Sequence, residues 1–134
     1  FILLTSKATP PSLAGTGAGS YYSAFPQYQG ADVGGFYDHA HNDYLEFLAE
    51  LGFVGYLPLA LLVLYSLYTS IWAMANRHDQ IARGVAFAAT MGIICLLIHS
   101  SVDFNLKIPA NALMFIAILG FAQVSKTLPR QHRK

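Results

Sequence analysis

A long run without a charged residue limits the folds open to this 134-residue chain more than any other feature. The run GFVGYLPLALLVLYSLYTSIWAMAN occupies residues 52–76. A helix of about 20 apolar residues crosses the hydrocarbon core of a bilayer. The alternative, a buried helix of a soluble protein, would normally show a polar stripe at this length. Tyr56 near one end and Trp72 near the other suit the aromatic belts of a membrane helix. The run therefore predicts a transmembrane helix.

The composition of the whole chain agrees with this interpretation. It is 54% hydrophobic and 11% charged, against about 25% charged residues in a typical soluble domain. Two further apolar runs cover residues 84–102 and 108–124. We therefore expect an all-α membrane protein with about three transmembrane helices. The net charge of +1 gives no reason to expect a nucleic-acid partner, and the single Cys95 excludes a disulfide framework within the chain.

Lysine and arginine are distributed unevenly about the three runs. The link at 77–83 and the tail at 125–134 together hold six of the eight basic residues, and Lys7 and Lys107 are the others. Because basic loops stay in the cytoplasm, this bias places the tail inside and the opposite loops outside.

The expected segments follow from these runs. They are a Gly- and Pro-rich outer loop (1–37), an amphipathic interfacial helix (38–51), a transmembrane helix (52–76), a cytoplasmic loop (77–83), a second transmembrane helix (84–102), a short outer loop (103–107), a third transmembrane helix (108–124) and a basic cytoplasmic tail (125–134).

Acidic residues mark the interfacial helix and the later outer loop. Asp43 and Glu46 have the form of a capping pair at the start of the interfacial helix. Asp103 and Lys107 are four residues apart, the spacing at which helical side chains meet. We expect these two to face an aqueous cavity together with His41, and the alternative is that they lie among lipid headgroups.

Two histidines stand directly before the first span, in the stretch YDHAHNDY. A neutral imidazole at His39 or His41 can accept a proton from a hydroxyl near neutral pH. A neighbouring carboxylate or amide can fix its tautomer. Two other interpretations stay open, namely a metal site built on the His-Ala-His pair and a purely structural cluster that caps the helix.

Three phrases resemble the bacterial O-antigen ligase and polymerase superfamily. His41-Asn42, nine residues, then Gly52-x-x-Gly55 resembles its His-Asn/Ser/Gln, nine residues, Gly-x-x-Gly pattern. GTGAGSYYSAFPQYQ is similar to the family's glycine-rich and aromatic segment upstream of the histidine. HSSVDFNLKIPANALMFIAILG resembles its late loop and final helix. The three occur in the family's order.

The resemblance implies an inner-membrane glycosyltransferase that acts in the periplasm. Such enzymes move a glycan from a polyprenyl pyrophosphate carrier, such as undecaprenyl pyrophosphate, to a hydroxyl of the lipid A core, another glycan or a protein. It implies that His41 is the catalytic residue, with no metal and no cofactor. The residues expected to bind substrate are His39, Asn42, Tyr44 and Lys107.

One departure from the family concerns the donor. Family arginines hold the pyrophosphate, a pairing that suits guanidinium geometry, but no arginine precedes Arg77 and that side of the chain is expected to be cytoplasmic. We therefore expect a C-terminal portion of such an enzyme, inactive alone. The alternatives are a polymerase of the same superfamily and a non-catalytic scaffold or transporter segment.

The charge bias generates a topology prediction. Cysteines introduced as Asp38→Cys and Gln131→Cys should react with a membrane-impermeant thiol reagent from opposite sides. Position 38 should label from the periplasm, and position 131 only after the inner membrane is opened. Labelling of both from one side would reject three spans.

Overall fold

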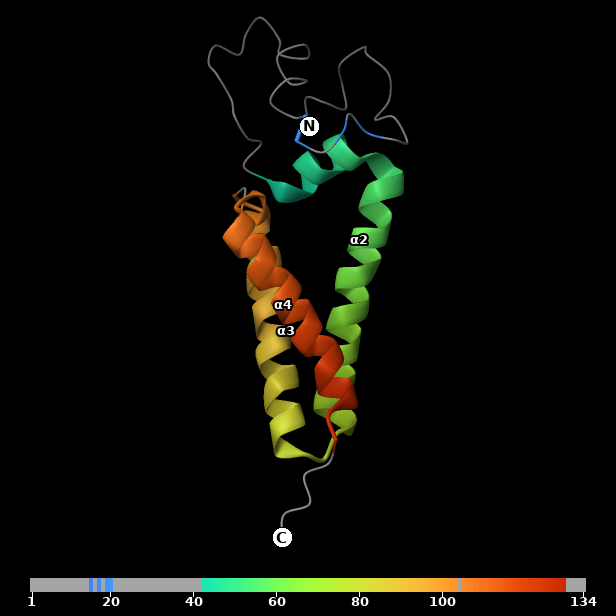
Figure 1. Ribbon diagram of the computed structural model, residues 1–134, viewed down its shortest axis with the longest axis vertical. Coiled ribbons are helices and arrows are strands. Elements are labelled where there is room, and N and C mark those ends of the chain that lie inside the picture. Colours follow the sequence, from blue (N-terminus) through green and yellow to red (C-terminus); the bar gives the residue numbers. More distant parts are fainter. Residues whose placement is uncertain (1–14, 16, 18, 21–41, 104, 130–134) are drawn as a thin grey trace, which may run out of the picture. The chain divides into compact units, whose positions relative to one another are not determined.

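Three long helices account for most of the computed structural model (Figure 1), which describes residues 15, 17, 19–20, 42–103 and 105–129. They are α2 (Asp43–Asn76), α3 (Gln80–Ser100) and α4 (Pro109–Thr127), with a short 3-10 helix, η3 (Asn105–Lys107), before α4. Each of the three is long and apolar enough to cross a membrane, and no strand occurs in the described residues. The predicted all-α membrane fold with about three spans is confirmed.

The chain divides into two units. The first comprises residues 1–59 with 100–104, and the second comprises residues 60–99 with 105–134. The first unit contains the start of α2. The second contains the rest of α2 together with most of α3, η3 and α4.

A capping aspartate sets the start of α3, and a proline marks the start of α4. α3 starts at Gln80, ahead of the apolar run, because Asp79 caps it: the Asp79 Oδ1 accepts from the Ala82 backbone N–H at 2.9 Å. α4 starts at Pro109, where a missing N–H leaves no helical bond unmade.

Small and branched side chains of α3 and α4 form the core of the second unit. The buried members are Ala89, Ile93, Phe115, Leu119 and Ala122. Gly92 permits a close approach, because a Cβ atom there would lie 3.1 Å from the Ile118 Cδ1. Small residues at a contact let membrane helices pack tightly without a hydrophobic driving force.

Hydrogen bonds between side chains also join the helices of the second unit. The Gln123 Nε2 donates to the Ser66 Oγ at 3.1 Å, and the Thr90 Oγ1 lies 2.9 Å from the Ser70 Oγ. Polar groups in hydrocarbon find partners on neighbouring helices in this way. Only 11% of the most apolar window of α2 is buried, so most of its apolar side chains are not covered by the other helices.

Candidate functional site at the break in α2

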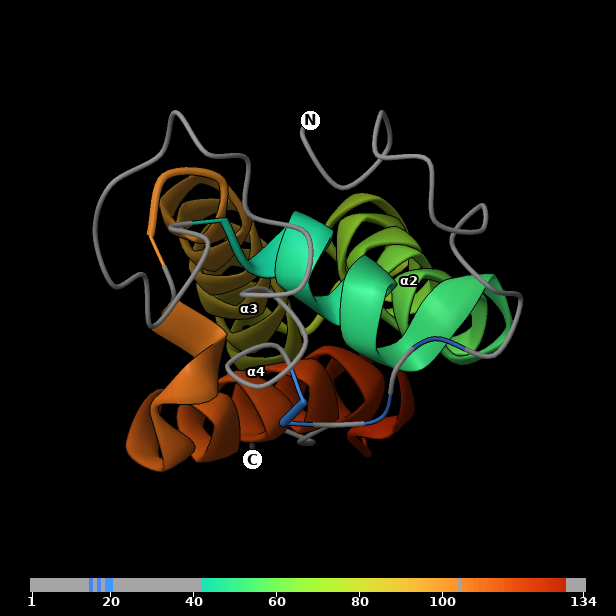
Figure 2. The ribbon, with the colours of Figure 1, turned by 90° about the horizontal axis from the view of Figure 1, so that it is seen from above.

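The helix α2 is interrupted at Gly52, in the first unit. The backbone there adopts φ 64° and ψ −176°. This region is open essentially to glycine alone, because a Cβ atom would collide with the neighbouring backbone. Figures 1 and 2 show that the teal turns of α2 run in a different direction from the first green turns after them, which belong to the same unit. Gly52 thus separates the polar start of α2 from its apolar length.

A glycine-rich segment is bonded to the helix next to this break. We call its described residues, Gly15, Gly17, Gly19 and Ser20, the glycine strap. The Gly17 N–H donates to the Glu50 carbonyl at 2.9 Å. Ser20 folds back on the strap, since its N–H and its hydroxyl donate to the Gly17 carbonyl at 3.2 Å and 2.6 Å. The strap therefore has its own turn and a direct backbone bond to α2.

Gly15 makes the closest approach of the strap to α2. A Cβ atom at Gly15 would lie 2.3 Å from both the Glu50 carbonyl oxygen and the Gly52 nitrogen, whereas one at Gly19 would meet nothing within 4 Å. Both glycines have a positive φ, 70° and 74°. Position 15 therefore favours glycine for two reasons, the close contact with the helix and the positive φ. Position 19 favours it only for the positive φ.

Asn42 caps the start of α2. Its Oδ1 accepts from the backbone N–H groups of Tyr44 at 3.1 Å and Leu45 at 3.2 Å, and its carbonyl accepts from the Glu46 N–H at 3.2 Å. These are the bonds of an N-cap residue. The predicted capping role of Asp43 is wrong, because Asp43 is the first residue inside the helix.

The same side chain joins α2 to a distant part of the chain. The Asn42 Nδ2 donates to the Ser101 carbonyl at 3.0 Å, directly after the end of α3. Both polar atoms of the amide thus have backbone partners. Asn42 holds the start of α2 at a fixed place in the first unit.

The acidic stripe before the break is buried. Asp43, Glu46 and Glu50 have exposed fractions of 0%, 1% and 3%, whereas Phe53 and Val54 just after the break are 57% and 63% exposed. Charged groups turn inward and apolar groups outward where the surroundings are apolar. This pattern suits a helix start that lies at a membrane surface.

The predicted site residues fall in different places. His39 and His41 lie outside the described residues. Tyr44 is the second residue of α2 and is half-buried. Lys107 is half-buried and ends η3 in the second unit. The turn that carries it is held to α4, since the Asn111 Nδ2 donates to the Asn105 Oδ1 at 2.6 Å.

Asp103 and Lys107 do not lie on one helix, although they are four residues apart. α3 ends at Ser100, Asp103 lies in a bend, and Lys107 belongs to a 3-10 helix. Their common cavity with His41 stays a prediction. Within the described ranges no three His, Cys, Asp or Glu side chains lie together as a metal site would need, and both residues of the His-Ala-His pair fall outside those ranges.

These observations define an α-helical membrane protein with a broken helix in its first unit. Residues 11–60 match the family model described as O-antigen ligase, which confirms the resemblance over that segment. Neither the curated proteins nor the solved structures gave a match to the chain.

The matched segment includes the strap, Asn42 and the break, and the structure gives several of these positions a physical reason. Gly52 supplies the positive φ. Gly55 sits beneath a side chain, because a Cβ atom there would lie 2.9 Å from the Leu51 Cβ. The spacing between Asn42 and Gly52 is the length of helix between its cap and its break.

Sequence reasoning did not single out Gly15, Gly17 or the Glu50 carbonyl. The glycine repeat in GTGAGS was a signal for an unusual backbone. It did not show which part of the chain the repeat would contact, because a backbone carbonyl leaves no mark in a sequence.

The strap contact generates a prediction with a matched control. Gly15→Ala should release the strap from Glu50, because the new methyl group would meet backbone atoms that cannot rotate away. Gly19→Ala should leave it bound, although both variants carry about 1–2 kcal/mol of positive-φ strain. Hydrogen exchange of the Gly17 amide, followed by mass spectrometry, reports the bond. Equal protection in the two variants would contradict the close approach at Gly15.

Proposed function

We propose that the protein takes part in the transfer of a glycan from a polyprenyl pyrophosphate carrier to an acceptor hydroxyl at the periplasmic face of the bacterial inner membrane. The match of residues 11–60 to the O-antigen ligase family carries this proposal. The matched segment includes His41, and the three membrane-crossing helices suit an enzyme whose donor is a membrane lipid. The proposed acceptor is the lipid A core, as in a ligase.

The proposed chemistry needs one base. The acceptor oxygen attacks the anomeric carbon of the glycan, and the bond from that carbon to the pyrophosphate oxygen breaks. The hydroxyl proton passes to the neutral imidazole of His41, and the carrier leaves as the pyrophosphate anion. A positioned general base of this kind contributes about 10²–10⁴-fold to a rate. Tyr44, Lys107 and His39 are proposed to contact the substrates.

Asn42 has a different part in this proposal. Its amide is engaged with the Tyr44 and Leu45 N–H groups and with the Ser101 carbonyl, so a substrate would have to displace existing bonds. Consecutive Cα atoms are about 3.8 Å apart. The bonds that hold Asn42 therefore limit where the preceding residue, His41, can reach. We assign Asn42 the role of a positioning residue.

The contacts around the break in α2 also support a positioned His41. The strap is bonded to Glu50 just before Gly52, and Asn42 is bonded to Ser101. In the sequence, both histidines therefore lie between two parts of the first unit that are hydrogen-bonded to other segments, namely the strap and Asn42. Binding and catalytic residues are often carried on loops that a rigid scaffold positions.

The role of His41 is tested by substitution in the intact cellular protein. His41→Ala should abolish glycan transfer while membrane insertion and abundance stay near those of the wild type, because a residue before the apolar run contributes no packing to the spans. The measurement is incorporation of glycan into the acceptor at matched expression. His39→Ala is the control and should have the milder effect, since a shift of two positions re-aims a side chain. Normal transfer by His41→Ala would leave a structural role for the cluster.

The role of Asn42 is tested by a graded pair of variants. Asn42→Ser keeps an oxygen that can cap the helix but cannot reach Ser101, whereas Asn42→Ala loses both functions. Loss of the cap costs about 1 kcal/mol, so transfer should fall in the order wild type, Asn42→Ser, Asn42→Ala. The pH at which the rate is half-maximal should not move, because the base is unchanged. A rise in KM for the acceptor with unchanged kcat would instead indicate that Asn42 binds substrate.

A further inference from the structure

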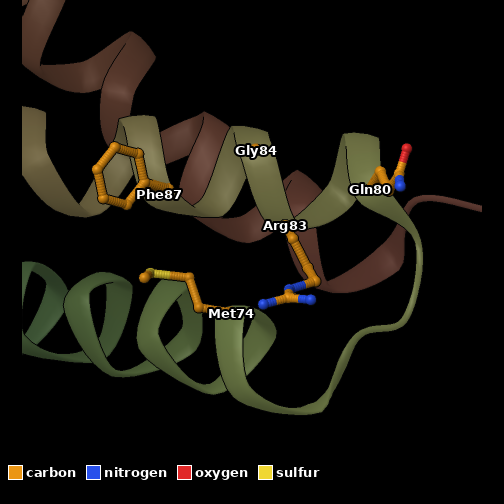
Figure 3. Close-up of a pocket in the computed structure, with 5 residues that line it drawn as sticks. All are labelled: Met74, Gln80, Arg83, Gly84 and Phe87. Carbon is orange, nitrogen blue, oxygen red and sulfur yellow. The ribbon is translucent and has the colours of Figure 1, made fainter.

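A hollow of about 380 Å³ opens in the second unit between the last turns of α2 and the first turns of α3 (Figure 3). Its lining residues are Met74, Gln80, Arg83, Gly84 and Phe87. The four from α3 follow the spacing i, i+3, i+4 and i+7, so they share one face of that helix. Nothing in the proposed transfer reaction uses these residues.

The lining changes from polar to apolar along the helix axis. Gln80 and Arg83 lie in the first turn of α3, next to the Arg77–Asp79 link. Phe87 lies one turn further, about 6 Å deeper into the span. Figure 3 shows the Arg83 guanidinium extended toward the turn of α2 that carries Met74. A lipid has the same order of groups, with a polar headgroup followed by an apolar acyl chain.

The charge at the polar end is positive. None of the described residues that line the hollow carries a carboxylate. The nearby carboxylate, Asp79, caps α3 through the Ala82 N–H, and the Arg77 guanidinium donates to the Leu128 carbonyl. Arg83 is the cation that faces the hollow, and a guanidinium suits a phosphate because it can donate two parallel hydrogen bonds.

Gly84 leaves free space on its side of the hollow. A Cβ atom at that position would meet nothing within 4 Å. The Met74 wall is held in place, since its Sδ lies 3.5 Å from the Thr90 Oγ1. The lining residues of α3 are exposed, so the space is an open depression at the surface of the unit. A larger side chain at Gly84 would extend into it without meeting another atom first.

We propose that this hollow binds one anionic phospholipid, with the lipid phosphate on Arg83 and Gln80 and an acyl chain along Met74 and Phe87. Basic pockets between membrane helices select anionic headgroups, and each basic residue near the surface contributes about 1 kcal/mol, or about fivefold in affinity. The phosphate of a zwitterionic lipid would bring its own cation close to Arg83, so phosphatidylglycerol is favoured over phosphatidylcholine.

Native mass spectrometry of the purified full chain tests this with phosphatidylglycerol and phosphatidylcholine of the same acyl chains. The wild type should retain phosphatidylglycerol preferentially. Arg83→Gln should reduce its retention about fivefold, and Gly84→Leu should reduce it by occupying the space. Arg83→Lys, which keeps the charge, should recover part of the binding. Helix content by circular dichroism shows that each variant is folded.

Two control variants match these changes. Lys126→Gln removes a positive charge that lies 5.8 Å from the centre of the Trp72 ring and is not among the lining residues. Gly120→Leu adds the same side chain at another glycine with open space. Both should bind phosphatidylglycerol as the wild type does. Equal retention of the two lipids, displacement by millimolar inorganic phosphate, or undiminished binding by Arg83→Gln and Gly84→Leu would overturn the proposal.

Discussion

The backbone conformation of Gly52 is the constraint on which the first unit depends. With φ at 64° and ψ at −176°, the helix changes direction where its composition changes from polar to apolar. The break lies beside the place where Gly15 and Gly17 meet the helix backbone. A straight helix at this point would leave the strap with no such backbone geometry to bind. One dihedral setting thus organises segments that are far apart in the sequence.

The two units are stabilised by different means. In the first, backbone and cap hydrogen bonds join separate segments, through the Glu50 carbonyl and the Asn42 amide. In the second, side chains on three spans pack and pair, as Ser66 does with Gln123. This difference follows from the surroundings, because hydrocarbon offers no partner to a backbone group and so favours complete helices.

Hydropathy was enough to predict the helical class and about three spans, because apolar length is a property of consecutive residues. Hydropathy could not identify the cap or the break of α2. Asp43 and Asn42 are both good capping residues, and the structure shows which of them lies just outside the helix. The role of Gly15 could not be predicted, since its neighbour is the backbone near Glu50, and backbone contacts between distant segments are not encoded by residue type. Asp103 and Lys107 are four residues apart but do not share a helix, because α3 ends at Ser100. The histidines stay a prediction from sequence alone.

Two hydrogen bonds to backbone carbonyls also determine which substitutions the first unit can accept. The strap is bonded at Glu50 and the cap at Ser101, and the sequence between Ser20 and Asn42 connects them. In both bonds the acceptor is a backbone carbonyl, which every residue type provides. Substitution of Glu50 or Ser101 therefore leaves the acceptor in place, whereas substitution of Asn42 removes a donor. The geometry around the break can thus be kept while the side chains at the two acceptor positions change.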